Sequence, residues 1–425
     1  MFKPLKQLFT KKNKDLRKRI YFTLAVLTLF IIGTTIEVPG TQAITKNLGF
    51  LELLNVMGGG ALEKFSIFSL GVTPYITASI IIQLLQMDII PYFKELSEQG
   101  HTGQQKINQI TRYVGIAFAF VQGFAMAYAF LGKDAGIINQ LEVALIMTAG
   151  TAFLLWLGDQ VTQKGIGNGI SLIIMAGIVA SLPNMMITAF KTLVDFTTTK
   201  SSIVGMASFL LFILVYLIVI VGVIFVEGAE RRISIQYANK STASLGKQTY
   251  MPIKINSAGV IPVIFASSLL AVPATIAQFV SNEKFTNFVN TYLDYTKPVG
   301  FVLFIVLIFF FAYFYTFVQM KPEQMAKNLQ NNGGYVPGIR PGEATTKYFS
   351  NVLSRLTIVG AFFLTVLAAL PILVNAFTDL PSTVSLGGTG LLIVVGVAIE
   401  TYKQLESSLL SRTYDGAKRN SRRKR

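Results

Sequence analysis

Two long apolar stretches constrain what this chain can fold into more than any other feature of its sequence. Residues 207–226 hold no charged side chain over twenty positions, and residues 298–320 hold none over twenty-three. A helix needs about twenty apolar residues to cross roughly 30 Å of hydrocarbon, because it rises about 1.5 Å per residue. Both stretches therefore predict membrane-spanning helices.

Apolar stretches of similar length recur along the whole chain. Only 14% of the 425 residues are charged, whereas a soluble domain usually carries about a quarter charged residues. We expect ten spans, at about 20–36, 73–92, 113–131, 141–160, 168–187, 207–227, 258–280, 299–320, 354–375 and 386–402. The sequence therefore predicts an all-α, polytopic membrane protein.

The basic residues are distributed unevenly between the segments that connect these spans. Thirty of the 37 lysines and arginines fall in the two chain ends and in every second connection, and the remaining connections hold seven. Cytoplasmic segments of membrane proteins are enriched in Lys and Arg. We therefore expect both termini in the cytoplasm and an even number of spans.

The stretch at residues 55–87 departs from the simple alternation of span and loop. Three glycines at 58–60 precede a ten-residue amphipathic piece at 61–70, which is too short to cross a membrane. Because Pro is favoured in a first helical turn, a new helix is expected to begin near Thr73. The residues before it predict a half-helix on a glycine hinge. An ordinary kinked helix after an external loop is the alternative interpretation.

Two expected cytoplasmic loops are long, at 228–257 and 321–353. The second is rich in Gly and Pro, which favour turns, so its tip is expected to be a shaped turn. Arg340 and Lys347 near that tip suit an acidic partner; a solvated loop that only satisfies the charge rule is the alternative. The basic tail at 418–425 predicts a topology and lipid-surface signal, with contact to ribosomal RNA as the alternative.

Several classes of function lack the side chains that they need. The chain has no Cys and a single histidine, His101, which argues against thiol-ligated metals and histidine-based sites. The glycine-rich residues 164–171 lack the Gly-Lys-Ser/Thr ending of a phosphate-binding loop. Asp159, Glu227 and Glu400 lie near predicted span ends, whereas ion-coupled transporters bury carboxylates at mid-membrane. Composition therefore favours a channel or a scaffold over a secondary small-solute transporter or an intramembrane enzyme.

Five separated segments indicate the type of protein more specifically than composition does. They are GGGALEKFSIFSLGVTPYITASIIIQLL at 58–85, LLWLGDQVTQKGIGNGISLI at 154–173, INSAGVIPVIFASSLLAVPATIA at 255–277, GYVPGIRPGEATTKYF at 334–349 and GGTGLLIVVGVAIE at 387–400. In this order and spacing they resemble the SecY family of protein-conducting channels. The loop at 228–257 departs from the family pattern, because its residues 240–244 are only modestly basic.

The resemblance implies an architecture of two pseudo-symmetric halves, with five spans each, that form an hourglass pore. The corresponding parts are a basic N-terminus at 1–19, an N-terminal half at 20–190, an external hinge at 191–206, a C-terminal half at 207–402 and a basic tail at 403–425. A plug at about 59–69 belongs to the N-terminal half, and both long loops belong to the C-terminal half.

The resemblance also assigns roles inside the pore. The plug comprises Gly59, Gly60, Ala61, Leu62, Glu63, Lys64, Phe65, Ser66, Ile67, Phe68 and Ser69. An apolar ring at the waist comprises Val72, Ile76, Ile174, Ile264 and Ile393; such a constriction dewets and resists ions. A polar cluster at a lateral gate between spans two and three and spans seven and eight comprises Gln83, Gln122 and Asn256.

The implied function is passage of secretory polypeptides across the membrane and lateral release of membrane segments, with no catalytic residue, metal or cofactor. The implied partners are SecE, SecG, the SecA ATPase, the ribosome, signal sequences, nascent polypeptides and membrane lipids. SecA or ribosome docking falls on Arg231, Arg232, Arg340, Pro341, Gly342 and Glu343. The implied location is the bacterial plasma membrane.

Overall fold

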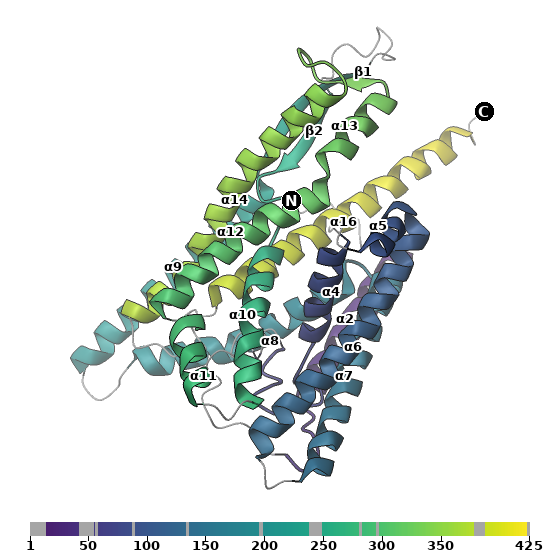
Figure 1. Cartoon of the computed structure of the whole chain (residues 1–425). Coiled ribbons are helices and arrows are strands. Elements are labelled where there is room, and N and C mark those ends of the chain that lie inside the picture. The colour runs from purple at the N-terminus through teal and green to yellow at the C-terminus, as the bar shows by residue number, and fades with distance from the viewer. Residues whose placement is uncertain are drawn as a thin grey trace. The chain divides into compact units, whose positions relative to one another are not determined.

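The computed structural model describes residues 14–41, 55, 58–86, 90–132, 136–194, 199–237, 249–279, 283–294, 297–377 and 387–422 (Figure 1). The chain divides into two compact units. Unit 1 comprises Met1–Phe209, Thr275–Asn282 and Asp379–Arg425, and unit 2 comprises Leu210–Ala274 and Glu283–Thr378. The modestly basic stretch at 240–244 lies outside the described residues.

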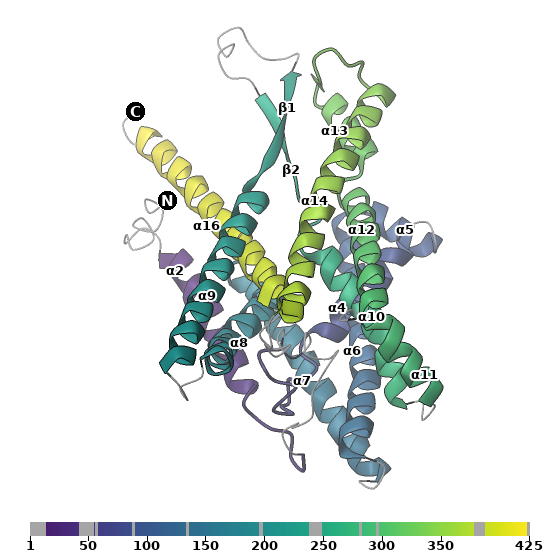
Figure 2. The same ribbon diagram turned by 90° about the vertical axis from the view of Figure 1, so that its left-hand side faces the viewer.

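Unit 1 is a bundle of helices around one short irregular segment. Its helices are α2 (Lys14–Gly33), α4 (Thr73–Leu85), α5 (Pro91–Glu98), α6 (His101–Leu131), α7 (Ile137–Lys164), α8 (Gly169–Leu193) and α16 (Gly387–Arg422). Helix α6 packs between α4 and α7, and α8 packs against α7 and α16. Figure 2 shows α6 and α7 side by side along most of their lengths.

Local sequence signals set several helix boundaries in unit 1. Pro74 lies in the first turn of α4, where its missing N–H leaves no intrahelical bond unmade. Asn168 caps α8, and its side-chain oxygen accepts from the amides of Ile170 and Ser171 at 3.1 and 3.4 Å. The hydroxyl oxygen of Thr23 accepts from the amide of Ile166 at 3.1 Å. That bond ties the turn before α8 to α2.

Unit 2 combines long helices with a small sheet. Helix α9 (Thr199–Gly228), which belongs to unit 2 from Leu210 onwards, leads into strands β1 (Glu230–Tyr237) and β2 (Thr249–Lys254). They are followed by α10 (Ile261–Phe279), which belongs to unit 2 as far as Ala274, by α11 (Glu283–Phe288) and by a π-helical turn at Val289–Leu293. Next come α12 (Pro298–Met320), α13 (Pro322–Asn331), β3 (Gly334–Tyr335) and α14 (Glu343–Phe377). The helices α12 and α13 both pack against α14.

The sheet joins the two long loops, at 228–257 and 321–353, into one structure. Its strand order is β2-β1-β3, and both pairings are antiparallel. Alternate side chains of β1 are buried, including Ile233 and Ile235, as expected for a strand with one covered face. They pack with α13 and the start of α14, where Phe349 and Leu353 are fully buried. We call the residues 230–237, 249–254 and 322–353 the sheet subdomain.

Each of the ten expected spans overlaps a helix, although α4 covers the expected span at 73–92 only as far as Leu85. Among the described residues, six helices are long and apolar enough to cross a membrane, namely α6, α7, α8, α9, α12 and α14. Almost none of the apolar window of α9 is buried, and its exposed side chains include Leu210, Leu214 and Ile218. Exposed aliphatic side chains of this kind suit contact with lipid or with another membrane helix. The strands are the part of the fold that the sequence did not predict.

Candidate functional site

The residues before α4 form a chain of turns and not the predicted half-helix. We call residues 58–72 the seated segment. Gly59, Gly60 and Gly71 have positive φ angles of 74°, 79° and 55°, and Phe65 has one of 49°. Such backbone angles do not continue a right-handed helix. The half-helix prediction was therefore wrong, and the glycine hinge stays a prediction. The predicted helix start at Thr73 is confirmed.

Backbone hydrogen bonds attach the seated segment to the chain that follows α2. Ser66 forms an antiparallel bridge with Glu37. The amide of Val38 donates to the carbonyl of Phe65, and the amide of Ile67 donates to the carbonyl of Ile36, each at 3.0 Å. This contact is two bonds wide, which is far less than a paired strand would provide.

Side-chain hydrogen bonds shape the seated segment from within. The hydroxyl of Ser69 donates to the carbonyls of Ala61, at 3.0 Å, and Ser66. The side-chain oxygen of Asn55 accepts from the amide of Glu63 at 3.0 Å. Ser66, Ser69 and Asn55 are all buried. Because a buried polar group without a partner is costly, these bonds permit the turns to lie inside the bundle.

Apolar side chains seat the segment among the surrounding helices. Leu62 and Phe65 are each 1% exposed and share a cluster with residues of α6 and α7, including Met126 and Met147. The ring of Phe68 stacks on Phe30 of α2 and on Phe153 of α7, with centroid separations of 6.1 and 6.2 Å. The segment is therefore a buried part of unit 1.

Small residues on the helices make room for this close fit. A Cβ atom on Gly150 of α7 would collide with the carbonyl oxygen of Ile67, and one on Gly33 of α2 would collide with the ring of Phe68. Gly59 approaches the backbone of Gly177 on α8, where an added Cβ would lie 3.2 Å from the Cα atom. Backbone therefore packs directly against backbone at Gly150 and Gly59, and the ring of Phe68 packs directly against backbone at Gly33.

Four of the five predicted ring residues belong to unit 1. Val72 caps α4, and the amide of Ile76 donates to its carbonyl at 3.2 Å, so the two residues are one turn apart as expected. Ile174 and Ile393 are buried on α8 and α16, which pack together. Ile264 lies on α10 in unit 2 and is partly buried. The five-residue ring stays a prediction.

The predicted gate residues also belong to different units. Gln83 of α4 donates to the hydroxyl of Ser79 at 3.2 Å, and its side-chain oxygen is buried without a partner among the described residues. Gln122 of α6 is partly buried. Asn256 lies in unit 2, directly before α10. Their grouping as a gate cluster stays a prediction.

A buried carboxylate holds Asn256, and sequence reasoning missed this pair. The side-chain nitrogen of Asn256 donates to Glu227 Oε1 at 2.7 Å and to the carbonyl of Gly259 at 3.1 Å. Both side chains are buried, at 3% and 6% exposure. An amide has two N–H groups, so both donors of Asn256 are engaged within unit 2. Glu227 precedes β1 and Asn256 follows β2, so the pair closes the base of the sheet subdomain.

A second polar pair joins α6 to α7. Arg112 Nη2 lies 2.6 Å from Asp159 Oδ2, with side-chain exposures of 42% and 24%. Short charge-assisted bonds of this kind fix the relative position of two helices more firmly than apolar contact alone. The sequence placed Asp159 near a span end but gave no sign of its partner.

The predicted docking arginines of β1 project from the sheet subdomain. Arg231 and Arg232 are exposed. Arg232 Nε donates to Glu230 Oε1 at 2.9 Å, and its guanidinium lies 4.7 Å from the ring centroid of Tyr250. The hydrogen bond from Glu230 raises the pKa of the Arg232 guanidinium above its ordinary value, so this side chain keeps its positive charge. The ring and the carboxylate hold it in one orientation.

The other predicted docking residues form a turn at the start of α14. The hydroxyl of Thr345 donates to the carbonyl of Arg340 at 2.9 Å, and Gly342 has a φ of 102° that suits glycine. The side chains of Arg340, Pro341 and Glu343 are exposed. This turn therefore fixes the backbone of Arg340 and leaves its guanidinium free to meet a partner.

Comparison with known proteins points to one family. The family model described as SecY matches residues 66–402. The protein translocase subunit SecY of Staphylococcus aureus is 50% identical over 95% of this chain and 97% of its own length, and that of Bacillus subtilis is 47% identical over 99% and 100%.

Solved structures share the fold at lower sequence identity. A structure described as a protein conducting channel superimposes with a TM-score of 0.67 at 20% identity, over 92% of both chains. Sec61 in a canine ribosome-channel complex from the endoplasmic reticulum gives a TM-score of 0.62 at 20% identity, again over 92% of both chains.

Proposed function

The chain belongs to the SecY family, whose members are protein-conducting channel subunits of protein translocases, and we propose that its seated segment is the plug of this channel. It is a multi-pass membrane protein, as the apolar helices require. The single observation that supports the plug is how the segment is held. Residues 58–72 are largely buried, yet among the described residues two backbone bonds attach them to residues 36–38 and one more joins Gly60 to Asn55.

A plug that can leave the channel needs this combination of buried side chains and few backbone hydrogen bonds to its surroundings. Apolar burial of side chains such as Leu62 and Phe65 excludes water and ions in the closed channel. An element without helix or strand of its own can leave as a unit, because few ordered backbone bonds must break. The glycines at its two ends supply the backbone freedom for that movement.

The ring and the gate complete the proposed pathway. Val72, Ile76, Ile174, Ile264 and Ile393 would form an apolar waist that resists ions yet yields around a passing chain. Replacing all five with polar residues should raise the resting ion leak, and an unchanged conductance would count against this ring.

The proposed lateral gate depends on a cluster of three polar side chains. Gln83, Gln122 and Asn256 would hold the gate closed through modest hydrogen bonds, each about 0.6 kcal/mol on average between membrane helices. The unpartnered oxygen of Gln83 supports this proposal, since it can accept a further bond. Gln83→Leu should alter how stringently signal sequences are selected; the cluster is merely structural if gating stays as in the wild type.

We propose that the partners are those of the family, and that the chain itself is not an enzyme. SecE would hold the two halves together, SecG would accompany them, and SecA or the ribosome would drive transport from the cytoplasm. The exposed Arg231, Arg232 and Arg340 on the sheet subdomain support a docking role for that surface. The location would be the bacterial plasma membrane, with both termini in the cytoplasm.

Reversible cross-linking of the seated segment tests the plug. The chain has no native Cys, so Phe68→Cys and Phe153→Cys can be combined at a site where the two rings are 6.2 Å apart. A bifunctional thiol reagent with an internal disulfide should lock the segment in place and block translocation, and reductant should restore it. The two single-cysteine variants are the controls. Full translocation through the cross-linked channel would refute the plug assignment.

A further inference from the structure

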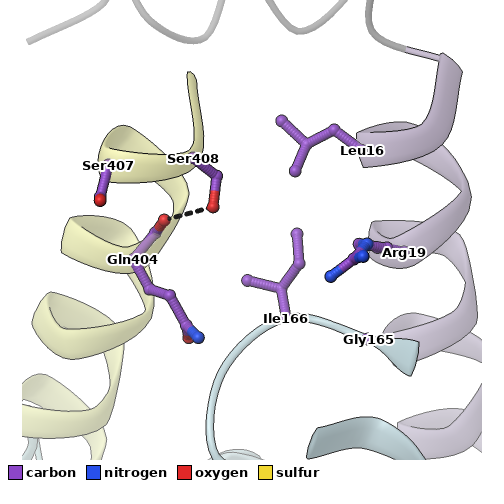
Figure 3. Close-up of a pocket in the computed structure, with 7 residues that line it drawn as sticks. All are labelled: Leu16, Arg19, Gly165, Ile166, Gln404, Ser407 and Ser408. Atoms are coloured by element: carbon purple, nitrogen blue, oxygen red, sulfur yellow. Dashed lines mark hydrogen bonds between the residues drawn. The ribbon is translucent and has the colours of Figure 1, made fainter. Parts of the chain in front are cut away.

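A cavity of about 370 Å³ lies in unit 1 where α2, α16 and the turn before α8 meet (Figure 3). Its polar lining comes from Arg19 of α2 and from Gln404, Ser407 and Ser408 of α16. Figure 3 shows the side chains of Leu16 and Arg19 extending from α2 towards α16. A volume of this size is typical of small-ligand sites.

The walls of this cavity are fixed by packing. Leu16, Ile166 and Leu409 form a buried cluster at 2%, 8% and 4% exposure, with Ile20 and Leu405 packed against it. The bond from the amide of Ile166 to Thr23 holds the turn at 165–168 in place. The cavity is therefore a built feature of three elements, and not a gap between mobile ends.

The lining carries one positive charge and several hydrogen-bond donors. Arg19 is about half exposed, and its only ion pair among the described residues is a long contact of 4.0 Å with Asp15, which is itself exposed. Surface pairs of this length hold a side chain weakly. The hydroxyl of Ser408 donates to the carbonyl of Gln404 at 2.9 Å, whereas the amide of Gln404 and the hydroxyl of Ser407 can still serve an anion. The chemistry of this lining suits a phosphate group.

The position of the cavity along α2 and α16 indicates that its phosphate belongs to a lipid headgroup. Arg19 directly precedes the expected span at 20–36 on α2, and Gln404 follows the end of the expected span at 386–402 on α16 by two residues. Both ends therefore lie where a span leaves the hydrocarbon, at the depth of the lipid headgroups. The positive-inside count assigns this level to the cytoplasmic surface, where anionic lipids attract basic segments. Basic pockets between membrane helices on that side commonly bind phosphate headgroups.

We propose that this cavity binds the phosphate group of an anionic phospholipid. Arg19 binds the phosphate oxygens, Gln404 and Ser407 donate to them or to the glycerol, and Leu16 and Ile166 contact the start of the acyl chains. A bound lipid bridges α2 and α16, which are far apart in sequence. Its presence would therefore stabilise the association of the first and last membrane helices of unit 1.

Lipid titration of the full-length chain in mild detergent tests this site. Phosphatidylglycerol is added at about 0.3 M salt, where diffuse attraction is screened beyond a few ångströms, and bound lipid is counted by native mass spectrometry. The expected result is one saturable site. Arg19→Gln should weaken it by about tenfold, because a bidentate charge-assisted contact is lost, and Arg19→Lys should restore part of the affinity.

Two matched variants separate a built site from general basic charge. Lys18 is exposed next to Arg19 but does not line the cavity, so Lys18→Gln should change the affinity by less than about twofold. Ser407→Trp should fill the cavity and abolish saturable binding while every charge remains. Thermal unfolding of each variant confirms that it is folded.

Three results would overturn the proposal. Equal effects of Arg19→Gln and Lys18→Gln would show that charge alone attracts the lipid. Saturable binding of phosphatidylcholine with the same affinity would show that the anionic headgroup is not recognised. Displacement of phosphatidylglycerol by about 10 mM inorganic phosphate, which adds little to the screening already present, would show that the site takes free phosphate rather than lipid.

Discussion

The seated segment and the sheet subdomain are both irregular insertions into a helical chain, yet they are held in opposite ways. Residues 58–72 have mostly buried side chains, but within the described part of the chain three backbone bonds, two to residues 36–38 and one to Asn55, attach them to the residues before them. The sheet subdomain has six paired positions between β1 and β2 and exposes the arginines of its surface. Burial without backbone pairing suits an element that must leave, and backbone pairing with exposed charge suits one that must stay and bind.

The largest expected effect is loss of the subdomain core. Phe349 is fully buried among Ile233, Leu329 and Leu353. Phe349→Ala should therefore destabilise the subdomain by about 3–5 kcal/mol, the usual range for a buried aromatic residue. Hydrogen exchange of the β1 and β2 amides should accelerate accordingly. Lys347→Ala, at an exposed position of the same helix, is the control; equal exchange in both variants would show that the subdomain does not depend on this core.

The second largest effect is expected from charge reversal at Arg340, in the turn before α14. Arg340 is exposed on a turn whose backbone is fixed by Thr345, so Arg340→Glu should leave the fold intact. Loss of a central binding arginine commonly weakens association by about 2–4 kcal/mol, which corresponds to roughly 30- to 1,000-fold. Driven translocation and motor or ribosome binding are the measurements. Lys327→Glu, exposed on α13, should have little effect, and a stronger defect there would relocate the docking surface.

A smaller effect is expected at the base of the subdomain. Asn256→Leu removes the donor that Glu227 accepts from at 2.7 Å. A hydrogen bond to a charged group contributes about 1.5–3 kcal/mol, so exchange at the start of β1 and the end of β2 should accelerate while the core amides stay protected. Ser257→Ala, which removes an exposed bond to Lys254, is the control. Uniform acceleration across the sheet would contradict a local role.

The smallest change concerns the seated segment. Ser69→Ala removes a buried hydroxyl whose one proton is shared between the carbonyls of Ala61 and Ser66. A loss of about 0.5–1.5 kcal/mol should raise the population of the unseated state, and with it the resting ion conductance, about twofold to tenfold. Ser97→Ala removes an exposed hydroxyl bond on α5 and should leave conductance unchanged. Equal conductance in wild type and Ser69→Ala would mean that this hydroxyl does not help to hold the seated segment.

The helices were predictable because their signals are local. Apolar runs and Pro74 were sufficient to place the six helices that are long and apolar enough to cross a membrane among the described residues, and the start of α4. The conformation of the seated segment was not, because it depends on its surroundings. Residues 61–70 are amphipathic enough for a helix, but the carbonyls of Ile36 and Ala61 and the rings around Phe68 select turns instead.

One strand of the sheet subdomain has a recognisable sequence pattern, but the charged residues within it drew attention away from that pattern. In Glu230–Tyr237, Ile233 and Ile235 alternate with polar residues, and this period of two indicates a half-buried strand. The arginines beside them were interpreted only as topology signals and docking groups. The pairs Glu227–Asn256 and Arg112–Asp159 have no such pattern, since residues 29 and 47 positions apart meet only through the tertiary fold.

The central claim is that residues 58–72 are seated in the closed channel and leave it during translocation. Spin labels at Glu63→Cys and Ile137→Cys test it most directly, since both positions are exposed in unit 1 and the chain has no other cysteine. Pulsed dipolar spectroscopy should give one narrow distance distribution in the idle channel. A second, longer population should appear when a translocating polypeptide is stalled inside. Identical distributions in the idle and stalled channels would contradict the account.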